Sequence, residues 1–328
     1  MALCFNKKKI VVLGTGGTIA GTADTASDNI GYTAARLGVD ELLRAVCPAG
    51  EFGYEVVSEQ VAQLDSKDMG PTVWRALHQR VSYWMSDTDV RGIVITHGTD
   101  TLEETAWFLQ LALEPRDLLA KPVVLACAMR PASALTPDGP QNLMDALAVV
   151  TTPEARGVVA VCAGIVHAAR DVMKVHPYRV NAFDSGDAGP LAYVEEGAVR
   201  MVKEWPLAPK TSYPAAVPFY AGDDWPWVEL VMSYAGARGA LVDGLVLNGV
   251  QGLVVASTGN GSLHEHLHAS LKLAVAAGIP VVRATRCQLG RILARAGDDL
   301  AASDGLSPVK ARISMMLALM EKKRLETS

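Results

Sequence analysis

The sequence predicts an α/β fold in two domains, and three features of the chain lead to this prediction. Apolar strand patterns alternate with helical patterns through the first 185 residues, which is typical of βαβ units around a parallel sheet. Residues 205–226 then contain five prolines and little periodicity, which indicates a linker. A second alternation of strand and helix patterns follows. We therefore expect an N-terminal domain over 1–204 and a C-terminal domain over 227–328.

Half of the 328 residues are apolar, so each domain can bury a sizeable core. In the N-terminal domain we expect strands at 9–14, 55–60, 92–96, 122–126 and 157–162. Its expected helices lie at 38–46, 72–84, 102–113 and 141–151. In the C-terminal domain we expect strands at 227–233, 244–247, 252–256 and 280–285, and helices at 262–277 and 308–322.

The composition excludes several classes of partner. The 30 basic and 35 acidic residues give a net charge of −5, so the chain lacks the basic footprint of a nucleic-acid-binding protein. No apolar run approaches the ~18 residues that a membrane helix needs. The apolar segment of a secretory signal is also missing from the N-terminus. We therefore expect neither nucleic acid nor membrane as a partner, and a cytoplasmic location unless a leader has been removed.

Two hydroxyl-rich segments directly follow expected strands. Residues 14–21 (GTGGTIAG) follow the first strand, and residues 96–101 (THGTDT) follow the third. Because open α/β sheets bind ligands beyond the carboxyl ends of their strands, both segments are candidate site loops. Neither contains the Gly-Lys-Ser/Thr of a phosphate-binding P-loop. Threonine hydroxyls beside glycines, with the carboxylate of Asp100 next to Thr99, suit acyl chemistry on a small polar substrate.

Each segment also has an interpretation without chemistry. The first is a common strand–turn–helix junction, and its glycines fail the dinucleotide pattern because the third glycine position is Ile19. The second could serve only to cap a helix. Residues 101–104 (TLEE) fit a capping box, as do residues 262–265 (SLHE), so helices are expected to begin at both places.

Metal-binding patterns are weak in this chain. The five cysteines contain no Cys-x-x-Cys pair, so neither a zinc knuckle nor a disulfide framework is indicated, and we interpret Cys127 and Cys162 as buried thiols. Residues 264–268 (HEHLH) match the His-Glu-x-x-His zinc motif. The capping box already explains Glu265, however, and no third ligand motif follows. We therefore expect exposed helix residues there and no metal.

Eight short motifs, spread almost from end to end, indicate a family. They lie at 15–21 (TGGTIAG), 63–69 (QLDSKDM), 95–105 (ITHGTDTLEET), 128–131 (AMRP), 138–140 (DGP), 170–174 (RDVMK), 259–261 (GNG) and 281–283 (VVR). With these motifs in this order, the chain closely resembles the bacterial-type L-asparaginases and glutaminase-asparaginases. The resemblance implies hydrolysis of the side-chain amide of L-asparagine to L-aspartate and ammonia through a threonyl acyl-enzyme, without metal or organic cofactor.

The resemblance also implies individual roles. Thr18 is the expected nucleophile, and Tyr32, at the far end of a candidate lid over 21–31, would help to move its proton. Thr99, Asp100 and Lys174 would form a second catalytic cluster, in which Asp100 also suits the α-ammonium group of the substrate. The expected substrate-binding residues are Ser66, Asp65, Gly98, Asp100, Ala128 and Asn260.

Two departures from the family bear on the substrate. Lys67 stands where well-known secreted members usually carry a glutamine. Those members also supply a late glutamate from the neighbouring subunit, but residues 286–299 contain none, and Gln288, Asp298 or Asp299 are the candidates to replace it. Comparable activity on L-glutamine or D-asparagine therefore stays open, because one methylene is worth only ~1–3 kcal/mol in a pocket. A catalytically weak amino-acid-binding regulator stays open as well.

The resemblance finally implies a fold and an assembly. The expected fold is α/β, with a larger N-terminal domain built on a flavodoxin-like parallel sheet and a smaller C-terminal α/β domain. The expected partners are a small amino-acid substrate and further copies of the chain. The copies would form a homotetramer of intimate dimers in which Asn260 reaches an active site across a subunit boundary.

Overall fold

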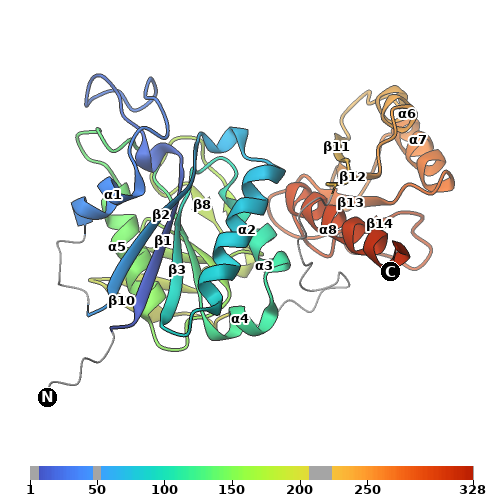
Figure 1. Ribbon diagram of the computed structural model, residues 1–328. Coiled ribbons are helices and arrows are strands. Elements are labelled where there is room, and N and C mark those ends of the chain that lie inside the picture. Colours follow the sequence, from blue (N-terminus) through green and yellow to red (C-terminus); the bar gives the residue numbers. More distant parts are fainter. Residues whose placement is uncertain (1–6, 47–52, 207–223, 328) are drawn as a thin grey trace, which may run out of the picture. The chain divides into compact units, whose positions relative to one another are not determined.

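The computed structural model describes residues 7–46, 53–206 and 224–327. The chain divides into two compact units, residues 1–211 and 212–328, and each unit has its own sheet (Figure 1). Most of the expected linker, residues 207–223, lies outside the described residues. Trp205, at the start of that expected linker, is buried in the core of the first unit.

Five parallel strands form the body of the first sheet. They are β1 (Lys9–Gly16), β2 (Glu55–Leu64), β3 (Val90–Thr96), β4 (Val123–Ala126) and β5 (Val158–Cys162). Their spatial order is β2-β1-β3-β4-β5, which is the order of the flavodoxin-like fold. The predicted α/β class with a flavodoxin-like N-terminal sheet is thereby confirmed. The strand order reverses between β1 and β3, which makes the carboxyl ends of these two strands the switch point of the sheet.

Helices cover both faces of this sheet, which explains why its central strands β1, β3, β4 and β5 are mainly apolar and almost wholly buried, whereas the edge strand β2 is only partly buried. Helices α1 (Val39–Val46) and α5 (Gly139–Thr151) pack on the face that carries Ile10 and Val12. Helices α2 (Pro71–Ser86) and α3 (Leu102–Ala112) lie on the other face, together with α4 (Pro115–Ala120) in the same region of the ribbon (Figure 1). The rings of Trp74 and Phe108 join α2 to α3 by stacking, with centroids 5.0 Å apart.

The sheet also has an antiparallel edge that the sequence did not predict. Strands β6 (Ile165–Ala168), β9 (Ala192–Glu195) and β10 (Ala198–Met201) extend it beyond β5. Two-residue turns join β5 to β6 and β9 to β10, and both residues of each turn have positive φ. This is the geometry of a type I′ hairpin turn, but the residues are Ala-Gly and Glu-Gly rather than the favoured Asn-Gly. The parallel prediction is therefore correct for five strands and incomplete at this edge.

Smaller elements connect the larger ones in the first unit. The 3₁₀ turns are η1 (Thr18–Ala20), η2 (Ser66–Asp68) and η3 (Gly186–Ala188). Strands β7 (Met173–Lys174) and β8 (Phe183–Asp184) pair into a short antiparallel hairpin. Cys127 and Cys162 are buried free thiols, as expected.

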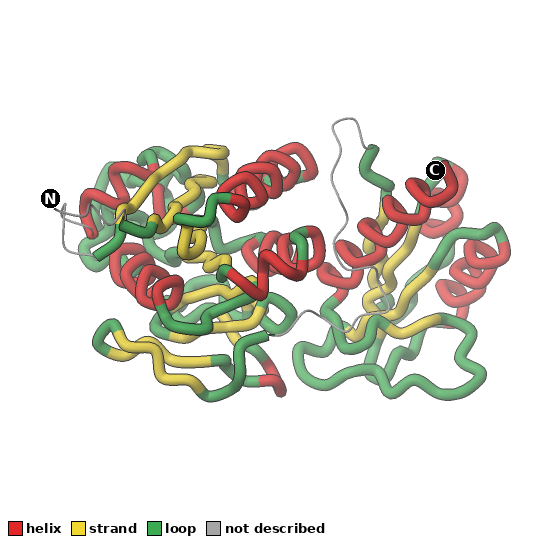
Figure 2. Tube along the Cα trace, turned by 60° about the horizontal axis from the view of Figure 1, so that its bottom comes forward, coloured by secondary structure: helices red, strands yellow, loops and turns green. Residues whose placement is uncertain are grey.

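The second unit is a parallel four-stranded sheet with helices on both faces (Figure 2). Its strands, in spatial order, are β11 (Val228–Met232), β12 (Gly252–Ser257), β13 (Val281–Thr285) and β14 (Ala301–Ala302). Its helices are α6 (Ala240–Leu247), α7 (Glu265–Ala276) and α8 (Pro308–Thr327). Helices α6 and α7 pack on the face of Leu253 and Val255, while α8 packs against the opposite side of the same strands.

The predicted strand at 244–247 is wrong, because these residues form the second half of α6. A short apolar run does not distinguish a buried strand from a helix by itself. Here residues 244–247 continue the apolar residues at 240–242, and together they form an eight-residue helix. Only one side of this helix packs against the core of the second unit. Leu247 is 87% exposed, which a strand in the middle of a covered sheet would not allow.

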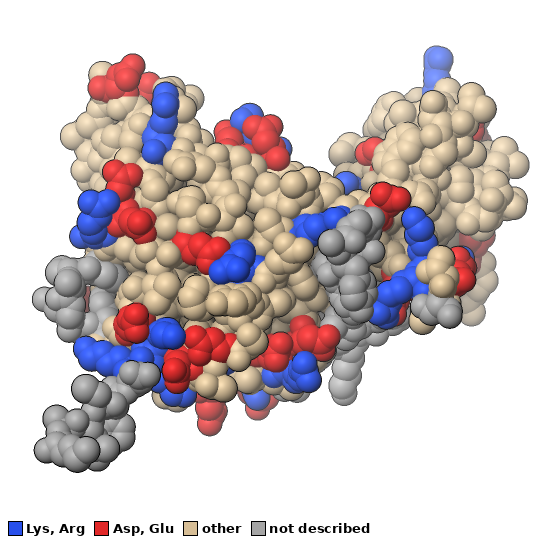
Figure 3. Space-filling view, in the orientation of Figure 1, with Lys and Arg blue, Asp and Glu red and all other residues tan. Residues whose placement is uncertain are grey.

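The described residues contain no helix that is both long and apolar enough to cross a membrane. On the face of the first unit seen in Figure 3, acidic and basic side chains are interspersed rather than separated. This distribution agrees with the slightly acidic composition of the chain.

Candidate active site

The two hydroxyl-rich segments lie side by side at the switch point of the first sheet. Strands β1 and β3 are parallel neighbours, and their pairing ends at Gly14 and Thr96. Beyond that pair, β1 leads into η1 with Thr18, and β3 leads into the loop that carries Thr99 and Asp100. The reversal of strand order leaves room for a ligand between the two connections.

Glycines allow three segments to touch at this point. Gly17 has φ 82° and ψ −171°, a backbone conformation that is essentially restricted to glycine. A Cβ atom on Gly17 would lie 2.3 Å from the Cα of Gly98, and one on Gly98 would lie 2.4 Å from the Oγ of Ser66. The loops after β1 and β3 thus touch backbone to backbone, and the side chain of Ser66 from the loop after β2 packs against Gly98, which brings the hydroxyl groups of the three loops into one region.

Replacing Gly17 by alanine is expected to lower kcat/KM by about 10²-fold, because the loops must separate and a displacement of about 1 Å has that cost. The substitution should also destabilise the unit by about 1–3 kcal/mol through its forbidden backbone angles. Steady-state kinetics and urea unfolding measure the two effects. Gly70→Ala is the matched control, since Gly70 has extended backbone and open space around its Cβ position. Equal losses in both variants would refute the packing argument.

Thr18 and Tyr32 form the first polar pair of the site. Thr18 is 7% exposed, and its Oγ1 lies 2.6 Å from the hydroxyl oxygen of Tyr32. Tyr32 is half-buried, and this burial raises its pKa above the ordinary tyrosine value, although the hydrogen bond from Thr18 acts in the opposite direction. Tyr32 therefore stays a neutral phenol at neutral pH and can both accept and donate a proton.

The candidate lid over 21–31 has a defined conformation. A β-bridge between Thr22 and Thr33 closes its base, and Oδ1 of Asp28 accepts hydrogen bonds from the amides of Ile30 and Gly31. Three more hydrogen bonds join it to the loop over 129–138. The amide of Ala132 donates to the carbonyl of Gly21, and the amide of Leu135 donates to the carbonyl of Ala26. The amide of Ala23 donates to Oγ of Ser133. These bonds hold the segment that presents Tyr32 to Thr18.

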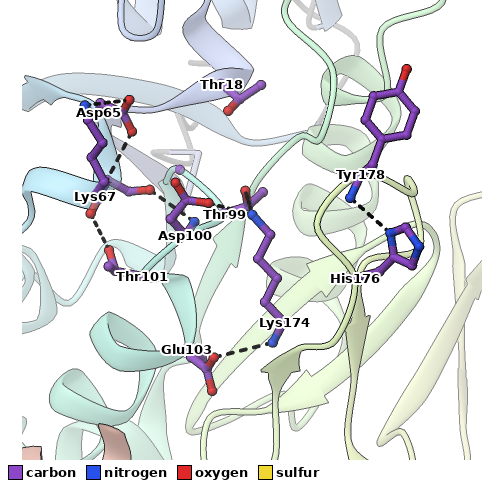
Figure 4. Close-up of polar contacts among 12 residues, drawn as sticks. Thr18, Asp65, Lys67, Thr99, Asp100, Thr101, Glu103, Lys174, His176 and Tyr178 are labelled. Carbon is purple, nitrogen blue, oxygen red and sulfur yellow. Dashed lines mark hydrogen bonds and ion pairs between the residues drawn. The ribbon is translucent and has the colours of Figure 1, made fainter. Parts of the chain in front are cut away.

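Thr99, Asp100 and Lys174 form the second polar cluster (Figure 4). The ammonium group of Lys174 donates to Oγ1 of Thr99 at 2.8 Å and to Oδ1 of Asp100 at 2.6 Å. Lys174 stands on the β7–β8 hairpin, and its backbone amide lies 3.5 Å from Oε1 of Glu103. The Lys174 side chain is 17% exposed and that of Asp100 is 53% exposed, so the carboxylate faces the solvent side of the cluster. A cavity of about 380 Å³ opens there.

Ser66 connects this cluster to the loop after β2. Its Oγ accepts a hydrogen bond from the Asp100 amide at 3.2 Å, and its carbonyl accepts one from the Thr101 hydroxyl at 2.7 Å. The predicted start of the helix is correct, but the predicted hydrogen bond to the Thr101 hydroxyl in the capping box at 101–104 is not formed. Thr101 is the N-cap residue of α3, but its hydroxyl bonds Ser66 rather than the first turn of the helix.

Lys67 interacts with carboxylates of its own loop. Its ammonium lies 2.9 Å from Oδ2 of Asp65 and 3.0 Å from Oδ2 of Asp68, and its side chain is largely exposed. Asp65 also caps η2 by accepting from the Lys67 amide. Lys67 thus partly neutralises Asp65, which the family resemblance places among the substrate-binding residues. Ala128 follows β4 and is fully buried, so its side chain is closed off by the protein.

The remaining expected site residues belong to the second unit. The side-chain amide of Asn260 is held by Leu293, whose amide donates to Asn260 Oδ1 at 2.7 Å and whose carbonyl accepts at 3.3 Å. The carboxylates of Asp298 and Asp299 are both paired within the unit, Asp298 with Arg283 and Asp299 with His268 and Lys272. The contribution of Asn260 to a site stays a prediction.

The histidine motif at 264–268 has a structural role in the second unit. His264 is the N-cap residue of α7, and its Nδ1 accepts from the amide of His266 at 3.3 Å. The predicted capping box from Ser262 is wrong, because the helix begins only at Glu265. His268 pairs with Asp299 instead of facing His264. In the part of the chain that the structure describes, no group of three or more His, Cys, Asp or Glu residues is arranged to hold a metal ion.

Sequence reasoning gave no role to His97, which lies inside the second loop. Its ring is completely buried, and Nδ1 lies 2.7 Å from the carbonyl oxygen of Gly98, to which it donates. Burial lowers the pKa of His97 to about 4. The imidazole is therefore neutral at working pH and fixes the carbonyl next to Thr99. The position of His97, between an apolar strand and a glycine, could have indicated a buried histidine from the sequence.

The buried His97 predicts a loss of stability in acid. Between pH 6.5 and about 4 the unfolded chain binds a proton at this histidine and the folded chain does not, so stability falls as the pH falls. The expected slope is about 1.4 kcal/mol per pH unit, or roughly 3 kcal/mol over the window. Urea unfolding of wild type and His97→Gln at several pH values isolates the effect. His266→Gln, at an exposed ring, is the control; identical slopes in all three proteins would contradict the assignment.

The first unit has a flavodoxin-like sheet with two threonine-centred clusters at its switch point, and a second α/β unit follows it. Together these features describe a two-domain α/β enzyme. The chain belongs to the asparaginase family. Residues 9–207 match the family model described as "Asparaginase, N-terminal", and residues 227–327 match the one described as "Glutaminase/Asparaginase C-terminal domain". The predicted family is thereby confirmed, and the chain is that of an L-asparaginase family enzyme.

Relatives of this family match the chain over nearly its whole length. L-asparaginase 2 of Escherichia coli (strain K12) is 36% identical over 96% of this chain and 89% of its own. A glutaminase-asparaginase of Pseudomonas fluorescens biotype A is 34% identical over 94% of this chain and 86% of its own. The crystal structure of a probable cytoplasmic L-asparaginase from Campylobacter jejuni has a TM-score of 0.87 and 34% identity, with 98% of both chains covered.

Proposed function

We propose that this protein hydrolyses the side-chain amide of L-asparagine to L-aspartate and ammonia through an acyl-enzyme on Thr18. One observation carries the proposal. A Thr–Tyr pair and a Thr–Asp–Lys cluster stand on adjacent strand ends, at hydrogen-bond distances of 2.6–2.8 Å. Amide hydrolysis needs a nucleophile, a route for its proton and anchors for the charged ends of the substrate, and this arrangement offers each of them.

The first half of the reaction uses the Thr18–Tyr32 pair. Oγ1 of Thr18 attacks the amide carbon, and its proton passes to the Tyr32 oxygen 2.6 Å away while the phenol passes its own proton on to the leaving amide nitrogen. A neutral phenol suits this relay, because it accepts and donates in one step. The leaving nitrogen takes up this proton and departs as ammonia, which leaves the aspartyl ester of Thr18.

The second half of the reaction uses the Thr99–Lys174 contact. Water adds to the ester carbon, and the Thr18 oxygen leaves with a proton, so that L-aspartate and free Thr18 result. Thr99, held by the Lys174 ammonium at 2.8 Å, orients this water or donates to the oxyanion. The carboxylate of Asp100 accepts from the α-ammonium of the substrate, and Ser66 lies next to it to bind the α-carboxylate.

The substrate class rests on the relatives as well as on the site. Relatives at 34–36% identity are named L-asparaginase or glutaminase-asparaginase. We propose L-asparagine as the preferred substrate. L-glutamine is the second candidate, because some of these relatives are named glutaminase-asparaginase. The pairing of Lys67 with Asp65 and Asp68 is a feature by which this chain differs from the secreted pattern, and it adds a cation to the loop that bears Ser66.

The deciding experiment measures ammonia release from purified protein with L-asparagine, L-glutamine and D-asparagine, each with and without a chelator. Chelator-resistant release that is fastest with L-asparagine supports the proposal. Faster release of ammonia from L-glutamine or D-asparagine would identify that amide as the preferred substrate and would leave the proposed mechanism unchanged. No release from any of the three amides, together with bound amino acid in calorimetry, would favour the regulator instead.

We further propose the domain boundaries, location and assembly given by the sequence. Domains at 1–204 and 227–328 would carry the site residues as described, and limited proteolysis tests the linker between them. The Campylobacter jejuni protein is described as a probable cytoplasmic L-asparaginase, which supports a cytoplasmic location, whereas a 36% identical Haemophilus influenzae relative is named periplasmic. Cell fractionation decides between the two. Light scattering of the purified protein tests the proposed homotetramer.

A further inference from the structure

Thr15 provides a buried hydroxyl at the switch point that the proposed mechanism does not use. We infer that Thr15 is a positioning residue, whose hydroxyl ties the end of β1 to the end of β3 and thereby sets the separation between Thr18 and the cluster around Thr99. The inference rests on the proposed function and adds to it a residue that contacts no substrate.

The hydroxyl continues the link between the strands where the backbone ladder stops. Strands β1 and β3 pair in register from Ile10 with Gly92 up to Gly14 with Thr96. At the next position Oγ1 of Thr15 donates to the carbonyl oxygen of Thr96 at 2.8 Å. The side chain of β1 therefore makes one more interstrand hydrogen bond, at the place where the two connections diverge.

The bond is placed symmetrically with respect to the two clusters. Thr15 precedes Thr18 by three positions, and Thr96 precedes Thr99 by three positions. Between these ends, Gly17 and Gly98 touch backbone to backbone. The two connections are thus joined at two points, and the hydrogen bond is the directional one. Without it, the direct contact between the two connections is the glycine contact, and each connection is otherwise held separately to the β2 end, Gly17 through its amide on the Leu64 carbonyl and Asp100 through its amide on Ser66 Oγ.

Burial makes this bond strong enough to act as a tie. Thr15 and Thr96 are each 1% exposed, so water does not compete for the hydroxyl or the carbonyl. Valine has nearly the shape of threonine and lacks the donor. A Thr15→Val substitution therefore removes the tie with little change in volume, while Thr15→Ser removes a methyl group and keeps the tie.

The test compares kcat and KM of wild type, Thr15→Val and Thr15→Ser in ammonia release from L-asparagine. We expect Thr15→Val to lower kcat by about 10- to 100-fold with KM changed less than about threefold, because a small displacement costs chemistry more than binding. Thr15→Ser should restore kcat to within about threefold of wild type. Thr15→Ala serves as the hydroxyl-free partner of Thr15→Ser if the valine variant does not fold.

Thr105→Val is the matched control for general destabilisation. Thr105 is a fully buried threonine in α3 of the same unit, and its hydroxyl accepts a hydrogen bond from Nε1 of Trp74 at 2.9 Å. This variant should lower the melting temperature and leave kcat unchanged. A kcat loss in Thr105→Val equal to that in Thr15→Val would overturn the positioning role, as would wild-type kcat in Thr15→Val.

The proposed function and this inference fail in different ways. Wild-type protein that releases no ammonia from any amide refutes the function before a Thr15 variant is measured. An active wild type with an equally active Thr15→Val refutes the positioning role alone. An active wild type, a slow Thr15→Val and a fast Thr15→Ser support both.

Discussion

Thr18→Ala is expected to lower kcat for amide hydrolysis by at least about 10³-fold, while the fold and substrate binding persist. Without Oγ1 no acyl-enzyme forms, and the partner hydroxyl of Tyr32, 2.6 Å from that oxygen in the wild type, has no proton to relay. The substitution removes a hydroxyl and a methyl group from a nearly buried position, so a loss of about 1–2 kcal/mol in unfolding free energy is expected besides.

Two comparisons separate loss of the nucleophile from loss of structure. Thr18→Ser keeps the hydroxyl and should retain measurable turnover, although the missing methyl group lets its side chain rotate more freely. Calorimetry with L-aspartate should give a similar Kd for wild type and Thr18→Ala, since the product's charged ends bind elsewhere. Thr18→Ala protein with wild-type kcat would refute the nucleophile assignment. A Thr18→Ser variant as inactive as Thr18→Ala would place the requirement in shape rather than in the hydroxyl.

The sheet could be predicted well because its strands obey a local rule. Ile10 to Leu13 are all fully buried, since both faces of a parallel sheet are covered, and such runs are visible in the sequence as unbroken apolar stretches. The antiparallel edge was missed for the opposite reason. Its turns have positive φ at Ala163 and Glu196, which do not favour it, so the glycine that follows each of them was the one local mark of the hairpins.

The site residues likewise fall into those that the local sequence indicates and those that it does not. Thr18 and Thr99 were accessible to physical reasoning because each directly follows a strand. Lys174 was not, because it lies 75 positions from Thr99 in the chain and reaches it only when the β7–β8 hairpin folds beside the sheet. Tyr32 and Ser66 likewise became candidates only through the family resemblance.

Hydroxyl partners were the least predictable feature. Thr101 has the pattern of a capping box, yet its hydroxyl bonds the carbonyl of Ser66 from another loop. Thr15 looked like part of a glycine-rich turn, yet it donates to Thr96 on the neighbouring strand. A hydroxyl can satisfy several nearby groups, and tertiary contacts decide among them after the local pattern has set the helix or strand.

Lys174→Met is expected to lower kcat by about 10²- to 10³-fold, the range in which positioned acid–base groups contribute. Methionine has a similar length but no ammonium, so Thr99 loses a donor at 2.8 Å and Asp100 loses its counter-ion at 2.6 Å. Lys121→Met is the matched control. Lys121 is also partly buried and donates two hydrogen bonds, but to the carbonyls of Met85 and Asp87 near the amino end of β4, away from the switch point. It should lose stability and keep kcat.

A second substitution distinguishes the two contacts of Lys174. If the ammonium acts only by neutralising Asp100, then adding Asp100→Asn to Lys174→Met removes the unpaired carboxylate and should recover much of kcat, at the cost of a higher KM. If the ammonium acts on Thr99, kcat of the double variant stays as low as that of Lys174→Met, because nothing replaces the donor to Oγ1. We expect the second outcome, since Asp100 is 53% exposed and solvent screens its charge, whereas Thr99 is buried and depends on Lys174 for its polar partner. Wild-type kcat in Lys174→Met itself would remove the lysine from the mechanism altogether.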